Sequence, residues 1–267
     1  MLRGQDKRLW LPSHRQRAAT PTVGFPGAPG IASAMDGEID WLRVAPPVTD
    51  YTVWFDSYDF RTIVGYGGSA VATEIWLGKK TGNVTYLAQA TSGNRPSFYG
   101  TKLGQYYAVD FTGNAFMDGT DVVPARPMSM IAAYDCDSIA STNHFLFSAT
   151  GGNNRIGVFF NAGDGSIEAN WVGVSNLDST LDTTTGPHVV GVAMSTTSTF
   201  WLYDGTTATV SNSTSTTAGA LRLGQYAGGS TNTFDGRIGE ILLWDRELSS
   251  TELASMYRYL KAKWGTP

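Results

Sequence analysis

A run in which apolar side chains alternate with polar or small ones opens at Tyr51, and such runs recur about every ten residues from Pro127 onward, the spacing of a sandwich of short strands. Two of these runs double back at Asp164-Gly165 and at Asp204-Gly205, dipeptides that favour tight hairpin turns. We therefore predict an all-β, antiparallel sandwich. The runs that carry the prediction are residues 51–59, 128–136, 144–149, 154–175, 188–195, 198–212 and 221–229.

The last of the apolar runs, residues 237–244, predicts a buried strand close to the C-terminus. In a regular strand, alternate side chains share a face. Ile238, Leu242 and Trp244 are therefore expected on one face, and Ile241 and Leu243 on the other. Both faces are apolar, so we expect this strand to be covered on both sides.

A short capped helix is predicted directly after this strand. Ser249 and Glu252 have the spacing of a capping box, and Gly265 is placed to end the helix. Leu248 before the cap and Leu253 after it match a hydrophobic staple. The apolar residues then follow a helical period and predict one buried stripe, made of Leu253, Met256, Tyr257, Leu260 and Trp264.

Residues 1–50 have a different pattern and predict an extended N-terminal arm, with the sandwich domain at 51–267. Its first 17 residues hold five basic residues against one acidic residue, a local formal charge of +4, with Arg8 and Arg15 among them. A stretch rich in Pro and Gly follows. Trp10, Phe25 and Trp41 are spaced along this arm, and large aromatic side chains favour a docked segment over the alternative of a disordered tail.

The composition limits the kinds of partner and of covalent cross-link that the protein can have. The 267 residues include 31 Gly and a single cysteine, which excludes an intrachain disulfide. The formal net charge of −4 argues against nucleic acid as the main partner. The basic start has no apolar core of a signal peptide, and no window reaches the length of a membrane span, so we expect neither.

The segment from Phe234 carries the pattern FxGxIGExLxWDRxLSxxE, followed by a helix that ends YLxxKWG. This segment resembles the closing segment of the laminin-G-like, concanavalin A-like jelly rolls that are common in bacterial surface proteins and phage virion proteins. The resemblance implies a concanavalin A-like jelly-roll sandwich with a short C-terminal helix. The residues that carry it here are Phe234, Gly236, Ile238, Glu240, Asp245, Arg246, Leu248, Ser249 and Glu252.

A second, looser match extends the resemblance over residues 51–265. The matched positions are Trp76, Gln89, Ala90, Thr91, Arg95, Pro96 and Phe111. The chain departs from the family at GKKTGNV (78–84) and at Thr112, where the family has acidic residues. These departures weaken any metal or ligand role at those positions, so the resemblance implies the fold more strongly than the function.

The sequence holds no clear catalytic constellation. Asp135 and Asp137 are spaced as a carboxylate pair on one strand face, but a pair of solvated turn residues is the favoured interpretation. His14, His144 and His188 have no motif partner, and there is no GxSxG or HExxH motif. We assign no catalytic residue and no metal ligand.

Calcium stays open as an alternative, because hard oxygen ligands on loops suit this ion. Against it, loop Asp residues more often form turns. The Asp residues placed in polar loops by the sequence are Asp118, Asp121, Asp164, Asp178, Asp182 and Asp235.

Sugar binding requires an exposed aromatic ring with amide or charged side chains beside it. Tyr226 is the candidate ring, and Asn153, Asn154, Arg155 and Asn232 are the candidate polar partners.

Together these features predict a non-enzymatic virion structural protein, as a capsid decoration, tail or fibre component. Its arm, through Trp10, Phe25, Trp41, Arg8 and Arg15, would bind other virion proteins. The sandwich would face outward as a homo-oligomer on the exposed virion surface, released by host lysis, and contact host-surface or environmental polysaccharide. The alternatives are a glycan-active hydrolase, which needs a buried carboxylate pair, and a bacterial surface adhesin, which needs an export signal.

Overall fold

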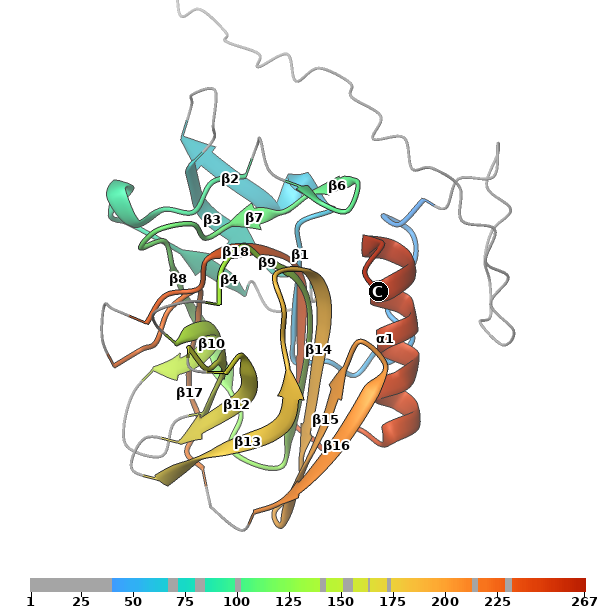
Figure 1. Cartoon of the computed structure of the whole chain (residues 1–267). Coiled ribbons are helices and arrows are strands. Elements are labelled where there is room, and N and C mark those ends of the chain that lie inside the picture. The colour runs from blue at the N-terminus through green and yellow to red at the C-terminus, as the bar shows by residue number, and fades with distance from the viewer. Residues whose placement is uncertain are drawn as a thin grey trace, which may run out of the picture.

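Two antiparallel sheets lie face to face, and one helix covers the outer face of the smaller sheet (Figure 1). The structure is a computed structural model that describes residues 40–66, 72–79, 85–98, 102–139, 143–150, 156–162, 164–171, 174–212, 216–228 and 232–267. The all-β, antiparallel sandwich with a C-terminal helix that the sequence predicts is confirmed.

Within the described residues, the smaller sheet has seven strands, and the closing strand of the chain lies second from one edge. The hairpin at Asp204-Gly205 forms as predicted, with both turn residues at positive φ. In sheet order the strands are β1 (Val53–Asp56), β18 (Gly236–Trp244), β9 (Met128–Cys136), β14 (Gly186–Met194), β15 (Ser198–Tyr203) and β16 (Thr206–Ser211), with β7 (Val109–Asp110) paired to β18.

The larger sheet has nine strands among the described residues. The predicted hairpin at Asp164-Gly165 joins two of them. In order the strands are β13 (Val174–Asp182), β12 (Ser166–Trp171), β11 (Ile156–Phe160), β10 (His144–Thr150), β17 (Gly219–Leu223), β8 (Met117–Val123), β4 (Tyr86–Ala88), β3 (Ala72–Leu77) and β2 (Ile63–Tyr66). A small hairpin of β5 (Lys102–Leu103) and β6 (Tyr106–Tyr107) and two 3-10 turns, η2 (Phe60–Thr62) and η3 (Ser92–Asn94), complete the described elements.

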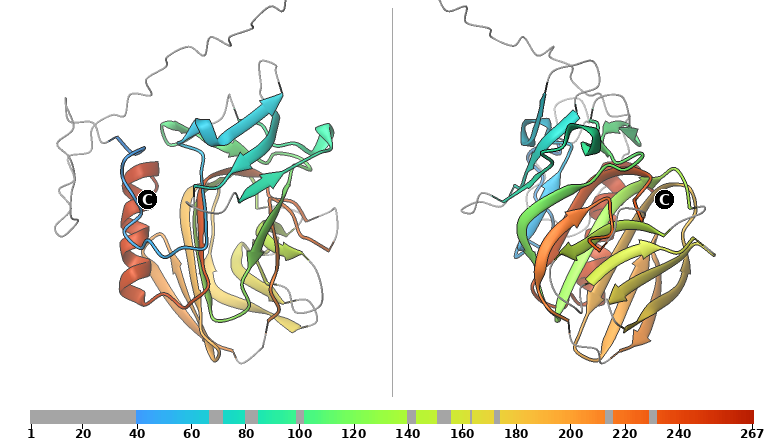
Figure 2. Two further views of the ribbon diagram at one scale, coloured as in Figure 1. Left: turned by 180° about the vertical axis from the view of Figure 1, so that it is seen from behind. Right: turned by 90° about the vertical axis from the view of Figure 1, so that its left-hand side faces the viewer.

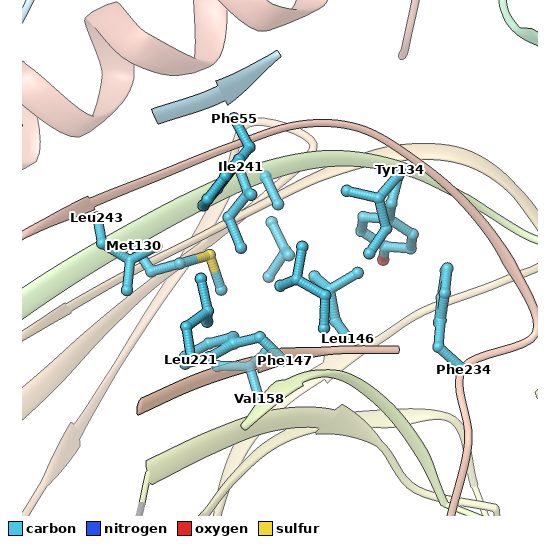
Figure 3. Packing of buried hydrophobic residues seen from close by; sticks show 14 of the residues in the cluster. Phe55, Met130, Tyr134, Leu146, Phe147, Val158, Leu221, Phe234, Ile241 and Leu243 are labelled. Atoms are coloured by element: carbon cyan, nitrogen blue, oxygen red, sulfur yellow. The ribbon is translucent and has the colours of Figure 1, made fainter. Parts of the chain in front are cut away.

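The main core fills the space between the two sheets. Figure 3 shows Met130 and Leu243 of the smaller sheet facing Phe147 and Leu221 of the larger one. Side chains of both sheets interdigitate there, and each fully buried side chain of this size contributes about 1.5–3 kcal/mol. The alternation along β14 is as predicted: Val190, Val192 and Met194 face this core, while Val189 and Ala193 face the opposite way.

A second core lies between the outer face of the seven-stranded sheet and helix α1 (Ser250–Trp264), which the left view of Figure 2 shows against that sheet. The predicted capping box is present, with Ser249 and Glu252 bonded to each other's backbone, and Gly265 ends the helix at a φ of 67°. The predicted stripe needs two changes: Tyr259 and Lys263 are also buried, and Tyr257 is only partly buried.

One predicted strand face is wrong. Ile238 lies in the main core with Ile241 and Leu243, not beside Leu242 and Trp244. The pairing of β18 with β9 shifts register between Ile238 and Glu240, so a bulge at Gly239 moves every residue before it to the other face. A side chain at Gly239 would lie within 2.9 Å of the Trp264 ring, so this position also allows the helix to approach.

The described end of the predicted arm packs on the sandwich. Trp41 and Val48 are buried in the second core, and the Trp41 ring meets the Tyr259 ring edge-on at 5.8 Å. The segment that packs on the sandwich therefore begins before residue 51, where the sequence placed the domain boundary.

A group of charged side chains is buried where α1, β18 and β1 meet. The Lys263 ammonium lies 2.7 Å from Glu240 Oε2 and 2.8 Å from Asp56 Oδ1. Lys79 Nζ binds the other oxygen of Asp56 at 2.9 Å. Burial disfavours the charged form of Lys263, but Asp56 and Glu240 more than offset this and raise its pKa. Two ammonium groups thus face two carboxylates, and the charges balance.

Glu240 also receives hydrogen bonds from three aromatic side chains. Trp54 Nε1 donates to Oε1 at 2.7 Å, and the Tyr259 hydroxyl donates to the same oxygen at 3.1 Å. Trp264 Nε1 donates to Oε2 at 3.0 Å. The buried carboxylate has partners on both oxygens, which is the condition under which a charged group is tolerated inside a protein.

Removing one member of this cluster should lower the stability of the protein. We expect Lys263→Met to lower the free energy of unfolding by about 3–5 kcal/mol, because it leaves the two carboxylates without their shared cation. Lys261→Met, two residues earlier on the exposed side of the same helix, should change it by less than about 0.5 kcal/mol. Denaturant unfolding measures both, and equal effects would contradict a special role for the buried cluster.

The helix cap should make stability depend on acid. Hydrogen bonds from Arg246 and from the backbone and hydroxyl of Ser249 lower the pKa of Glu252 from 4.5 to about 2. The stabilisation that accompanies this lowered pKa is fully present above pH 4.5 and is lost as the pH falls towards 2. Glu252→Gln keeps the capping hydrogen bond and removes the charge, so it should cost about 0.3–1 kcal/mol near pH 7 and progressively less as the pH falls below 4.5.

Unfolding free energies measured between pH 7 and pH 2 test this expectation. Glu247→Gln, which removes an exposed carboxylate just before the helix, is the control, and its effect on the unfolding free energy should not change over this pH range. A cost for Glu252→Gln that is constant over this range would contradict the assigned role of its charge.

Candidate functional site

A polar hollow of about 530 Å³ lies on the outer face of the nine-stranded sheet. Leu221 and Leu223 of β17 face the core, so Arg222 between them faces outward, and the same alternation turns Asp118 of β8 outward. The volume falls within the range of about 300–1,000 Å³ that small-molecule sites have. The hollow is lined by Asn94, Asn114, Phe116, Arg222, Gln225, Ala227 and Gly228.

Arg222 lines this hollow, and each nitrogen of its guanidinium has a hydrogen-bond partner. Its Nε and Nη2 donate to the two oxygens of Asp118 at 2.6 and 2.8 Å, a bidentate ion pair. Its Nη1 donates to Gln225 Oε1 at 3.1 Å, and the guanidinium lies 4.4 Å from the centre of the Phe116 ring. The arginine is therefore fixed in position, and its charge is matched by that of Asp118.

One wall of the hollow is built by the motif around Gln89. The Gln89 side chain accepts from the Thr91 N–H at 2.9 Å and donates to the Phe116 carbonyl at 3.2 Å. Arg95 donates to the carbonyls of Gln89 and Ala90 at 2.7 and 2.9 Å. These bonds fold residues 89–95 into a loop that carries η3, and so the family-like motif positions Asn94 at the hollow.

Two amides at the rim are available to a ligand. Within the described part of the chain, the side chains of Asn94 and Asn114 form no hydrogen bond. The Asn94 carbonyl accepts from the Phe116 N–H at 3.1 Å, so the backbone that carries the amide is tied down. An amide offers both donors and an acceptor, the combination that a sugar hydroxyl requires.

Beside the hollow, three aromatic rings form a row across the outer face of the sheet. Tyr226 lies 4.8 Å from Phe145, and Phe145 stacks on Phe159 at 4.6 Å. Tyr226, the ring chosen from the sequence, is half-buried and follows directly on Gln225 of the lining. Asn232 contributes its carbonyl to the Tyr226 N–H at 2.8 Å, so its described contact is with the backbone of Tyr226.

The other residues chosen from the sequence fall into two groups. Trp41 is 4% exposed and packed within its own chain, so its ring is not available to a partner. The positions outside the described residues are Asn153, Asn154 and Arg155 of the sugar site and Trp10, Phe25, Arg8 and Arg15 of the arm.

The carboxylate pair weighed for hydrolysis is held by an arginine. Arg237 Nη1 lies 3.0 Å from Asp135 Oδ2, and Arg237 Nη2 lies 2.8 Å from Asp137 Oδ2. Burial raises the pKa of Asp135, and Arg237 acts in the opposite direction. Asp135 and Asp137 share one cation, which describes an ion-pair network at the end of β9.

His188 has partners that its sequence context did not reveal. Its Nδ1 lies 2.7 Å from Asp204 Oδ2 and 2.8 Å from the Tyr203 hydroxyl, and its Nε2 lies 2.9 Å from the Thr184 carbonyl. Asp204 also accepts from the Val189 N–H at 2.9 Å. These bonds tie the turn of the β15–β16 hairpin to the start of β14.

The predicted loop positions of several Asp residues are wrong. Asp118 lies in β8, where it pairs with Arg222, and Asp178 and Asp182 lie in β13. Asp164 accepts the Ser166 N–H and acts as a turn former, and Asp178 accepts the Thr180 N–H where the pairing of β13 shifts register. Among the described residues, no group of three or more His, Cys, Asp or Glu side chains could hold a metal ion.

A second hollow, of about 580 Å³, lies between α1 and the β15–β16 hairpin. Its lining includes Phe200, Leu202 and Tyr257 and is more apolar than that of the first. The hollow at Arg222 is therefore the better candidate for a polar ligand.

No helix in the described part of the chain has the length and apolar character to cross a membrane.

No protein-family model and no curated protein matches the chain. Solved structures resemble it in fold. The sialidase of Trypanosoma rangeli in complex with 2,3-difluoro-KDN is 11% identical with a TM-score of 0.54, over 88% of this chain and 36% of that chain. The same sialidase in complex with the inhibitor DANA is 12% identical with a TM-score of 0.52, over 85% of this chain and 36% of that chain.

A smaller neighbour is the CBM40 of the Ruminococcus gnavus IT-sialidase bound to α2,6-sialyllactose. It is 14% identical with a TM-score of 0.41, over 49% of this chain and 82% of that chain. The chain thus spans about a third of the length of the T. rangeli sialidase, at 36%. At such identities the likeness to that sialidase is one of fold.

Sequence reasoning selects one residue beside the candidate hollow, Tyr226, and none of the residues that line it. Tyr226 was selected from the Gly- and Asn-rich context that follows β17. The sequence does not single out Arg222 and names Asp118 only among the loop Asp residues considered for calcium, because the two residues are 104 residues apart and only the pairing of β17 with β8 brings them together. The motif around Gln89 was the available signal, since a conspicuous Gln-Ala-Thr…Arg-Pro stretch marked the loop that carries Asn94.

Proposed function

We propose that the chain is a non-enzymatic, glycan-binding sandwich whose site is the hollow at Arg222. The observation that carries the proposal is the pair of unengaged amides, Asn94 and Asn114, that line the same hollow as an arginine fixed by its ion pair. Sugars are recognised by directed hydrogen bonds to hydroxyls combined with contact to apolar ring surface. The Phe116 ring and the neighbouring Tyr226 provide such apolar surface.

A binding role is supported over a hydrolytic one by the state of the carboxylates. Asp135 and Asp137 are both engaged by Arg237, and they lie on a different sheet from the hollow. A glycosidase needs two carboxyl groups that flank the bond to be cleaved. Beside the hollow, the carboxylate of Asp118 is bound on both oxygens by Arg222.

The finer part of the proposal is that the chain is a structural component of a virion surface. It is supported by the resemblance of the closing segment to the jelly rolls of phage virion proteins. It is supported as well by the composition of residues 1–39, with a basic start, Trp10 and Phe25. These residues would bind other virion proteins, and the sandwich would face outward as a homo-oligomer and meet host-surface or environmental polysaccharide.

Substitution of the free amides tests the binding site. Asn94→Ala and Asn114→Ala should each weaken glycan binding by about tenfold, the loss of roughly one well-placed hydrogen bond, with unchanged thermal stability. Ser92→Ala, an exposed change in the same 3-10 turn outside the lining, is the control. A glycan array followed by calorimetry on the full chain measures the effect.

Two results would overturn the proposed function. The first is full-length protein that binds no glycan on a broad array. The second is release of new reducing ends from a bound glycan, which would support the hydrolase alternative and make Asp135 and Asp137 the residues to test. Binding that both amide variants retain would place the site elsewhere on the molecule.

Removal of residues 1–39 tests the role of the arm. This cut keeps Trp41, whose ring is buried against Tyr259, so the sandwich should remain folded with an unchanged melting temperature. We expect the truncated protein to lose incorporation into particles in a complementation assay with the full-length chain as control. Full occupancy by the truncated protein would contradict the proposed arm.

A further inference from the structure

The hollow at Arg222 carries no uncompensated positive charge. Arg222 is the one cation among its described lining residues, and it is paired bidentately with Asp118. Arg95, in the loop that forms one wall, donates to two carbonyls and lies 3.5 Å from Glu74. A site that takes an anionic ligand usually presents a guanidinium or ammonium group that is free to pair with it.

The carboxylate of Asp118 would oppose an acidic ligand directly. It occupies the Nε–Nη2 edge of Arg222, which is the edge that a ligand carboxylate would bind in bidentate fashion. Gln225 Oε1 occupies Nη1 from the other side. A ligand carboxylate would therefore have to displace Asp118 or lie close to it, and like charges at such distances repel.

The groups that remain at the rim suit hydroxyls. Asn94 and Asn114 present amides that donate and accept, and the ring of Phe116 lies between the loop and the arginine. We infer that this hollow selects neutral polyhydroxylated sugars over sugars that bear a carboxylate. The inference rests on the proposed glycan binding and adds the class of sugar and the residue that sets it, Asp118.

Paired ligands on the full-length protein test the inference. Hexose oligosaccharides and hexuronate oligosaccharides of the same linkage differ chiefly in a CH₂OH or a carboxylate on each ring. Wild-type protein should bind the neutral member of such pairs at least about tenfold more tightly at low ionic strength, where charge repulsion is least screened.

Asp118→Asn is the decisive variant, because it keeps the shape of the side chain and removes its charge. It leaves the charge of Arg222 unmatched, so the ratio of neutral to acidic binding should fall by about tenfold or reverse. Asp245→Asn removes the same charge from an exposed position after β18 and should leave the ratio unchanged. Melting temperatures of both variants identify any loss of fold.

The outcomes separate the two claims. If neutral and acidic glycans both fail to bind, the proposed function is overturned and this inference with it. If glycans bind but the acidic member is preferred, or a folded Asp118→Asn protein keeps the wild-type ratio, the site binds sugars and the inferred selectivity is wrong. If Asp118→Asn unfolds, the wild-type preference between paired ligands still decides the class of sugar.

Discussion

A charge inside a protein is stable only where opposite charges and hydrogen bonds replace the water that it has lost. In this chain the requirement is met by Lys263, which lies between Glu240 and Asp56, with Lys79 on the far side of Asp56. These residues come from the end of α1, the middle of β18, the end of β1 and the turn after β3. Lys263 meets both carboxylates only when α1, β18 and β1 have assembled, so the cluster links the C-terminal helix to a strand near the start of the sandwich.

The position of the helix also decides where a ligand can bind. The helix, with Trp41 and Val48, covers the outer face of the seven-stranded sheet. No described helix covers the outer face of the nine-stranded sheet (Figure 1). The outward residues of that face include the ion pair of Arg222 and Asp118. The same sandwich therefore has one face devoted to stability and one face with polar groups that are free to contact a ligand.

Paired charges have a different consequence in the buried cluster under the helix and at the hollow. Under the helix the pairing is complete and buried, which makes the cluster part of the core. At the hollow the ion pair is partly open to solvent, and the side chain of Asp118 is 46% exposed. There the pair contributes little to stability, but it determines which charges a ligand can bring into the site.

The sequence by itself determined the elements that depend on neighbours in the chain. The capping box of Ser249 and Glu252, the hairpin turn at Asp204 and the alternation along β14 follow from local rules and are present as predicted. Contacts between distant segments were decided only by the tertiary structure. The bulge at Gly239 turned Ile238 to the other face, and strand pairing brought Asp118 to Arg222 across 104 residues. Local patterns record backbone preferences, whereas the partner of a buried or paired charge depends on which strands become neighbours.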